Sequence, residues 1–244
     1  MGDWPQGYAR HVFDKLDSTL SEAARMAPTL SGPAWILAGE QSAARGRRGR
    51  AWATPPGNFA GTLIMPRTGS PANAALRSFV ASLALREAFV EVTGQTDVFA
   101  LKWPNDVLLK GGKVAGILLE TVGEHLLIGI GVNLRHAPTP EQVEAGAVTP
   151  VSVFSVTGVH VQPEAFLDAL ASAFARFEDQ FTTYGFSPIR TAWLSHAARI
   201  GEVVTARTMR DETVGVFEDV DEAGNLILKT AKGRVAITAA DVYF

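Results

Sequence analysis

The residues with the clearest chemical potential form a short basic segment at positions 45–50. It reads Arg-Gly-Arg-Arg-Gly-Arg, so four guanidinium groups stand within six residues. Guanidinium groups bind phosphate oxygens through paired hydrogen bonds and stay charged when water is excluded, and glycines let a backbone turn tightly beside a ligand. Because like charges repel one another, we expect the segment to be mobile until an anion binds. By itself it fits a phosphate-binding loop, a nucleic-acid patch or a solvated loop.

A second polar cluster, Lys102-Trp103-Pro104-Asn105-Asp106, follows an apolar and β-prone stretch. Ligand sites favour the ends of strands in a sheet. Lys102 could therefore contact a phosphate, and Asn105 could contact a metal-bound phosphate. The alternative is a turn with a buried tryptophan, in which Asp106 only stabilises the turn.

Lys113 opens an otherwise apolar stretch directly after Gly111-Gly112, a pair that predicts a two-residue hairpin turn. A lysine within an apolar strand is costly to bury without an anionic partner. We therefore predict such a partner for Lys113, and an edge-strand position is the alternative. Glycines within strands can mark places where a ligand lies against bare backbone, and the candidates are Gly116, Gly129 and Gly131.

The rest of the sequence predicts the elements that position these clusters. Thr19 and Glu22 form a Thr-x-x-Glu capping box, which predicts a short helix ending near Met26. Apolar runs predict strands at 35–38, 62–65, 98–103, 107–110, 113–120 and 126–133. Helical spacing predicts helices at 72–93, from 163 along an apolar stripe to 181, and at 187–193, with a surface loop at 136–150.

The character of the chain changes after about Arg199. Short β-prone runs at 203–206, 214–217, 226–228 and 235–238 are separated by turn-like residues. This pattern predicts a small antiparallel barrel appended to an α+β domain. We therefore predict two domains, residues 1–198 and residues 199–244.

The composition restricts the class of protein. The chain has 244 residues, is 47% hydrophobic and carries a net charge of −3, which indicates a globular core and argues against a general nucleic-acid binder. It has no cysteine, which excludes thiolate nucleophiles, disulfides and cysteine-based zinc sites. The start of the chain lacks the layout of a signal peptide, and no apolar run reaches the roughly 18–20 residues of a membrane span. We expect a cytoplasmic protein without a membrane partner.

Combined, the motifs resemble those of the biotin protein ligases, of the type without an N-terminal DNA-binding domain. The quoted segments are Asp17-Ser18-Thr19, Gln41 with the arginine segment through Trp52, the 102–106 cluster followed by Lys113-Val114-Ala115-Gly116, and residues 127–134. The resemblance spans nearly the whole chain. Two positions depart from the family pattern, because Leu20 replaces an asparagine and Ala44 replaces a glycine.

The resemblance implies a fold and an activity. The fold would be α+β, with a mixed β-sheet catalytic domain of the biotin/lipoate ligase type and a small C-terminal SH3-like β-barrel. Biotin and ATP would give biotinyl-5'-adenylate and pyrophosphate, and a lysine of a biotin carboxyl carrier protein would then take the biotin and release AMP. ATP and Mg²⁺ would be the cofactors. The partners would be biotin and the carrier domain of a biotin-dependent carboxylase, without DNA, and a homodimer is left open.

The resemblance also implies residue roles. The catalytic residues would be Lys113, Arg47 and Asp106, with Lys113 between carboxylate and phosphate and Asp106 beside the attacking lysine. The biotin-binding residues would be Ser18, Thr19, Gln41, Arg45, Gly46, Arg47, Lys113, Gly116 and Gly129. The ATP-binding residues would be Arg48, Arg50, Trp52, Lys102, Asn105 and Asn133, with Trp52 on adenine and Asn105 toward the metal.

Three other functions compete with this one. Lipoate ligases resemble the chain in fold but carry an Arg-Arg-x-Ser-Gly-Gly-Gly loop, and this chain has no such run. A repressor of transcription would need a DNA-binding domain before Asp17, where too few residues stand for one. A non-enzymatic nucleotide or RNA binder would use the arginine segment and would bind with a steep salt dependence.

Overall fold

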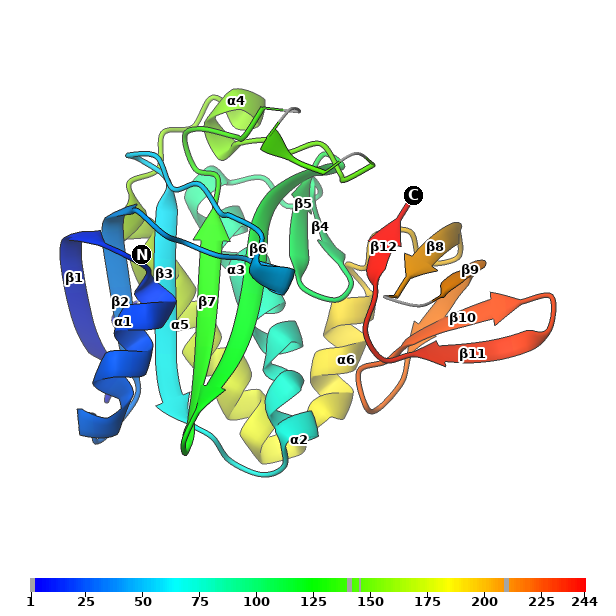
Figure 1. The fold of residues 1–244 in the computed structure, drawn as a ribbon, viewed down its shortest axis with the longest axis horizontal. Helices are drawn as coiled ribbons and strands as arrows, with labels where there is room; N and C mark the ends of the chain where they lie inside the picture. Colours follow the sequence, from blue (N-terminus) through cyan, green and yellow to red (C-terminus); the bar gives the residue numbers. More distant parts are fainter. Residues whose placement is uncertain (1–2, 140–141, 145, 209–210) are drawn as a thin grey trace.

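The computed structural model describes residues 3–139, 142–144, 146–208 and 211–244. Its centre is a seven-stranded sheet with the strand order β1-β2-β3-β7-β6-β5-β4 (Figure 1). The strands are β1 (Ala9–Leu16), β2 (Ala34–Gln41), β3 (Phe59–Pro66), β4 (Phe99–Lys102), β5 (Asp106–Leu109), β6 (Gly112–Val122) and β7 (His125–Val132). β1 and β2 run parallel, whereas the other neighbours run antiparallel. The sheet is therefore mixed, as predicted.

Helices cover both faces of this sheet (Figure 1). α3 (Arg77–Thr93) and α5 (Pro163–Tyr184) pack together on one face, and α1 (Thr19–Met26) packs on the other. The shorter helices are α2 (Pro71–Ala75), α4 (Val153–Thr157), α6 (Phe186–Leu194) and two 3₁₀ helices, η1 (Ala27–Thr29) and η2 (Arg47–Gly49). The predicted apolar stripe of α5 is confirmed, because Phe166 and Phe174 are fully buried and Phe181 is nearly so.

The hairpin between β5 and β6 turns one residue earlier than predicted. Lys110 and Gly111 have φ angles of 47° and 84°, so they form the turn. Gly112 is already the first residue of β6 and pairs with Leu109. A Cβ at Gly112 would lie 2.4 Å from the side chain of Val151, so close packing explains this second glycine.

Two predicted helix details are wrong. The N-cap of α1 is Ser18, so Thr19 is the first helical residue and the Thr19–Glu22 capping box does not form. The hydroxyl of Thr19 donates to Gln41 instead. The predicted helix at 72–93 is divided at Leu76 into α2 and α3, although Gly94 does end it in a left-handed conformation with a φ of 69°.

The sequence patterns missed β1, α4 and a C-terminal strand. β1 is an edge strand with a largely exposed surface, so its residues lack a continuous apolar run. The described part of the predicted 136–150 loop has neither strand nor α-helix. It is not only a surface loop, because the backbone N–H of Lys113 donates to the Thr149 carbonyl at 2.9 Å.

The C-terminal residues form a second, five-stranded antiparallel sheet with the order β11-β10-β9-β8-β12. Its strands are β8 (Val203–Arg207), β9 (Glu212–Val220), β10 (Leu226–Thr230), β11 (Gly233–Ile237) and β12 (Asp241–Tyr243). In the described part of the chain β11 and β12 are the open edges and do not pair with each other. The predicted closed, SH3-like barrel is therefore not confirmed. The sheet lies beside β4 and α6 (Figure 1), and the Trp103 indole N–H donates to the Gly224 carbonyl at 3.0 Å.

Across the described residues, the helices are all too short or too polar to cross a membrane.

Candidate active site

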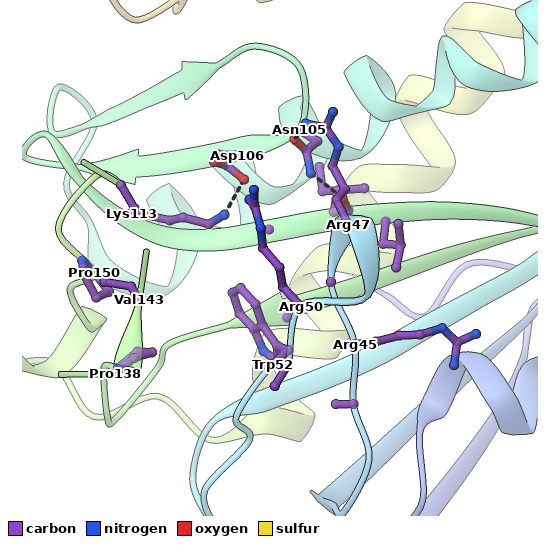
Figure 2. A pocket seen from close by; sticks show the side chains of 18 of the residues that line it. Arg45, Arg47, Arg50, Trp52, Asn105, Asp106, Lys113, Pro138, Val143 and Pro150 are labelled. Atoms are coloured by element: carbon purple, nitrogen blue, oxygen red, sulfur yellow. Dashed lines mark hydrogen bonds and ion pairs between the residues drawn. The ribbon is translucent and has the colours of Figure 1, made fainter. Parts of the chain in front are cut away.

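A cavity of about 780 Å³ opens above β6 and β7. Figure 2 shows the arginine segment on one side of it and the β5–β6 hairpin on the other. The cavity lies within the size range of small-molecule sites. It is lined by 15 of the residues to which the sequence gives a role, namely Ser18, Thr19, Gln41, Arg45, Gly46, Arg47, Arg50, Trp52, Lys102, Asn105, Asp106, Lys113, Gly116, Gly129 and Asn133. Arg48 is the predicted residue that does not line it.

One end of the cavity is polar and uncharged. Gln41 Oε1 accepts hydrogen bonds from the backbone N–H and the hydroxyl of Thr19 at 2.7 and 3.1 Å. The Thr62 hydroxyl donates to the Thr19 hydroxyl at 2.9 Å, and Gln41 Nε2 donates to the Thr54 hydroxyl at 3.0 Å. Ser18 lies beside them and is 2% exposed. The end thus offers fixed donors and acceptors to a neutral polar group.

The other end is cationic and is organised around Asp106. Lys113 Nζ lies 2.7 Å from Asp106 Oδ1, and Lys102 Nζ lies 3.8 Å from Asp106 Oδ2. The anionic partner predicted for Lys113 is thus confirmed. Burial acts to raise the pKa of Asp106, but the charges of Lys113 and Lys102 outweigh it and hold this pKa below its usual value. Burial lowers the pKa of Lys102.

A β-bulge brings Lys113 to this face of the sheet. Asp106 pairs with Gly116 and Val107 with Ala115, but Leu108 pairs with Lys113, so Val114 is the extra residue. Side chains alternate along a strand, and one extra residue inverts the alternation. The Lys113 side chain therefore lies on the same face as Gly116, and its Nζ is 3.6 Å from the position of a Cβ built there.

Two asparagines are fixed at the edges of the cationic end. The Asn105 side chain accepts from Arg47 Nη1 at 3.2 Å and donates to the Ile117 carbonyl at 2.6 Å, so both ends of its amide are used. The Asn133 side chain donates to the Val151 carbonyl at 3.1 Å. Its Oδ1 is buried without a partner among the described residues, which leaves one acceptor free beside the cavity.

Large side chains cover the strand glycines. A Cβ at Gly131 would lie 2.4 Å from the Trp52 ring, and one at Gly129 would lie 2.7 Å from Leu20. In this structure the side chains of Trp52 and Leu20 pack over these two glycines, which line the cavity, and ligand contact with their backbone stays a prediction. At Gly116 the approach is looser, since a Cβ there would lie 3.4 Å from Trp52.

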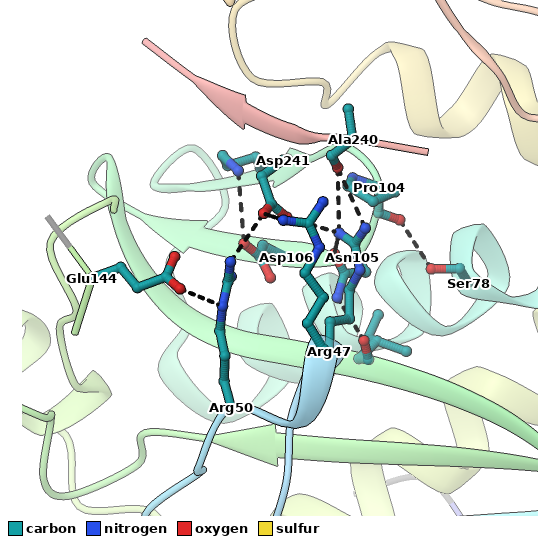
Figure 3. A network of polar contacts seen from close by, with 12 residues as sticks. Arg47, Arg50, Ser78, Pro104, Asn105, Asp106, Glu144, Ala240 and Asp241 are labelled. Carbon is teal, nitrogen blue, oxygen red and sulfur yellow. Dashed lines mark hydrogen bonds and ion pairs between the residues drawn. The ribbon is translucent and has the colours of Figure 1, made fainter. Parts of the chain in front are cut away.

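The four arginines of the segment point in two directions. Arg45 points away from Lys113 toward α1 (Figure 2) and pairs with Glu120 at 2.8 Å and with the Ser21 hydroxyl at 3.1 Å. The other three converge on Asp241 of β12 (Figure 3). The segment that we expected to be mobile without an anion is thus paired with carboxylates of its own chain.

Sequence patterns also missed part of the cavity wall. This part comes from the loop before α4 and from the end of the chain, and its residues include Pro138, Val143, Glu144, Val148, Asp241 and Tyr243. Each stands in a segment without a recognisable motif. The negative charge of Asp241 was the available signal, because a dense cluster of arginines needs carboxylates nearby.

Comparisons of the chain with family models and with known proteins agree on one family. Residues 12–133 match the biotin/lipoate A/B protein ligase family, and residues 200–244 match the biotin protein ligase C-terminal domain. The chain is 55% identical to a biotin–[acetyl-CoA-carboxylase] ligase of Paracoccus denitrificans over 96% of this chain and 99% of that protein.

More distant relatives agree with this match. A bifunctional ligase/repressor of Bacillus subtilis is 31% identical over 85% of this chain and 65% of its own length. The biotin protein ligase from Aquifex aeolicus, solved in complex with biotin and ATP, has a TM-score of 0.85 at 24% identity over 96% of this chain and 97% of that one. The chain therefore belongs to the biotin/lipoate A/B protein ligase family.

Proposed function

We propose that this protein is a biotin–[acetyl-CoA-carboxylase] ligase. It joins biotin to ATP to form biotinyl-5'-adenylate, and it then transfers biotin to a lysine of a biotin carboxyl carrier domain. The 55% identity to a ligase of that name over nearly both whole chains supports the substrate. The observation that carries the chemistry is the cavity itself, which has an uncharged hydrogen-bonding end and a cationic end about Lys113.

The two ends of the cavity suit the two ends of biotin. The ureido ring is neutral and carries both donors and acceptors, so it fits the end formed by Ser18, Thr19 and Gln41. The carboxylate is an anion and fits the end with Lys113. This arrangement assigns Lys113 to the carboxylate without moving it from Asp106, because an ammonium group has three donors.

In the first half-reaction a biotin carboxylate oxygen attacks the α-phosphorus of ATP. The bond from this phosphorus to the bridging oxygen breaks, and pyrophosphate leaves. Lys113 and Arg47 offset the repulsion between the two anions and stabilise the charge that develops at phosphorus. Holding both reactants in one cavity contributes up to about 7–11 kcal/mol through positioning.

In the second half-reaction the neutral amine of the acceptor lysine attacks the acyl carbon of the adenylate. The bond to the phosphate oxygen breaks and AMP leaves. Asp106 is a weak candidate for the base that takes the lysine proton, because its lowered pKa makes it a poor acceptor. We assign it instead to the positioning of Lys113 and Lys102.

Mg²⁺ is proposed to enter with the phosphates of ATP. The described residues contain no cluster of three or more His, Cys, Asp or Glu side chains that could hold a metal. The Asn105 amide oxygen is the predicted protein ligand, and it already accepts from Arg47. One neutral oxygen fits Mg²⁺, which usually keeps several waters and phosphate oxygens as ligands. Its charge would screen the phosphates during adenylate formation.

Three further expectations stay predictions: the division into domains at 198/199, a cytoplasmic location, and assembly as a homodimer. The same holds for the absence of DNA binding.

One assay separates biotin ligation from its rivals. The protein is mixed with ATP, Mg²⁺ and a biotin carrier domain, and either biotin or lipoate is supplied. We expect the mass of the carrier to rise by one biotinyl group when biotin is supplied and to stay unchanged when lipoate is supplied. Modification in the lipoate sample but not in the biotin sample would support a lipoate ligase. If neither sample is modified and the protein binds RNA in a separate measurement, the non-enzymatic alternative would be supported.

A further inference from the structure

We propose that Asp241 is an internal substitute for nucleotide phosphate, which holds residues 47–50 in the ligand-free protein and is displaced by ATP. Asp241 Oδ2 lies 2.9 Å from Arg48 Nη1 and 3.1 Å from Arg50 Nη2, and Asp241 Oδ1 lies 3.5 Å from Arg47 Nη1 (Figure 3). Three guanidinium groups thus share one carboxylate. Such convergence is the arrangement with which arginines bind a phosphate group.

The contact is held firmly on the carboxylate side. Asp241 is the first residue of β12 and pairs with Arg207 of β8, so its backbone belongs to the C-terminal sheet. Its side chain is 15% exposed, and the residue lines the cavity. The preceding carbonyl, that of Ala240, accepts from both terminal nitrogens of Arg47 at 3.4 Å. The C-terminal sheet therefore fixes the arginines from across the cavity.

The charges favour exchange for a nucleotide. Residues 47, 48 and 50 carry three positive charges, and among the described residues they form ion pairs with Asp241 and with Glu144, whose Oε1 lies 2.8 Å from the Nε of Arg50 (Figure 3). A triphosphate brings more negative charge and more acceptor oxygens than one carboxylate does. The arginines can therefore leave Asp241 for the phosphates, while without ATP they stay paired.

The exchange has a thermodynamic consequence, which rests on the proposed use of ATP. The apparent affinity of a ligand that must displace an internal contact is its intrinsic affinity multiplied by the fraction of molecules in which that contact is open. Removal of the Asp241 charge should therefore free the arginines, loosen the segment and strengthen the binding of ATP.

The test uses the full chain with Asp241→Asn, which keeps the shape of the side chain. Limited trypsin digestion of the ligand-free protein is followed by mass spectrometry, because cuts after residues 45, 47, 48 and 50 report on this segment. We expect cleavage there to be several-fold faster than in the wild type. ATP with biotin should slow cleavage in both proteins. The KM for ATP in adenylate formation should fall by about threefold to tenfold.

Two further variants serve as controls. Glu222→Gln removes an exposed charge from the turn between β9 and β10 and should change neither cleavage nor KM. Asp241→Glu keeps the charge and should stay closer to the wild type than Asp241→Asn does. Three results for Asp241→Asn would each overturn the proposal. They are unchanged cleavage of the segment, cleavage spread over the whole C-terminal sheet, and a KM for ATP equal to or higher than that of the wild type. The digestion does not depend on catalysis, so it still tests the contact if biotin ligation itself fails.

Discussion

The Nζ of Lys113 lies 2.7 Å from Oδ1 of Asp106, across the hairpin of β5 and β6. The pair exists because the bulge at Val114 turns the lysine to the face on which Asp106 stands. Asp106 also faces Lys102, so one carboxylate keeps two ammonium groups in place beside the cavity. The bulge in β6 therefore determines that the ammonium group of Lys113 lies in the cavity, where it can act on a bound anion.

Lys113→Ala should reduce adenylate formation by about 10²–10³-fold, the usual loss for a group that stabilises developing charge. The measurement is biotin-dependent release of pyrophosphate. Lys232→Ala, which removes an exposed lysine from the turn between β10 and β11, should leave the rate unchanged. A wild-type rate for Lys113→Ala would exclude Lys113 from the reaction.

Asp106→Asn should destabilise the protein by about 3 kcal/mol, the lower part of the range for a broken buried ion pair, because Lys113 is partly exposed. Lys113 and Lys102 would then repel each other without an anion between them. Chemical denaturation at pH 7 measures the loss. Asp179→Asn, on the surface of α5, is the matched control. Equal stability of Asp106→Asn and the wild type would show that the pair contributes nothing to the fold.

The same pair predicts a dependence on pH. The pKa of Asp106 in the folded protein is lower than its ordinary value of 3.8, so folding favours the carboxylate. Its contribution is complete above the ordinary value and is lost as the pH falls through the lowered pKa of the folded state. The difference in unfolding free energy between wild type and Asp106→Asn should thus be constant from pH 7 to 5 and shrink below about pH 4. A difference that grows with acidification would contradict the assignment.

The sequence predicted six of the seven strands of the central sheet, the long helices and the polar and charged residues of the cavity, because apolar periodicity and the polar motifs are local signals. It predicted that Lys113 needs an anionic partner, and Asp106 is that partner. It did not predict the bulge at Val114, because register depends on how two strands meet rather than on either one alone.

Other failures have the same origin. The direction in which the side chains of Arg47, Arg48 and Arg50 point depends on Asp241, which lies about 190 residues further along the chain. The sequence also did not predict that the side chains of Trp52 and Leu20 pack over the glycines of β7. No local pattern reports which distant side chain occupies a gap.

Thr62→Val should weaken biotin binding without affecting ATP. Thr62 is fully buried and donates to the Thr19 hydroxyl, behind the residues proposed to hold the ureido ring. Valine keeps the shape but removes the hydrogen bond, which is worth about 0.5–1.5 kcal/mol. The KM for biotin should therefore rise by about threefold to tenfold with little change in kcat. Thr121→Val, on the exposed part of β6, is the control. An unchanged KM for biotin would show that this hydrogen bond does not position Thr19 for the ligand.

Gly131→Ala should displace Trp52 and weaken ATP binding. An added Cβ would lie 2.4 Å from atoms of the indole ring, which is too close for a real contact, so the ring must move off the sheet. If Trp52 stacks on adenine, as predicted from the sequence, the KM for ATP should rise by about fivefold or more, since base–aromatic stacking is worth about 1–3 kcal/mol. The emission of Trp52, obtained as the difference between each protein and the same protein with Trp52→Phe, should shift as the ring becomes exposed. Gly123→Ala is the control, because nothing lies within 4 Å of its added Cβ, although its φ of 55° adds some backbone strain. A shifted spectrum with an unchanged KM for ATP would remove Trp52 from the adenine site.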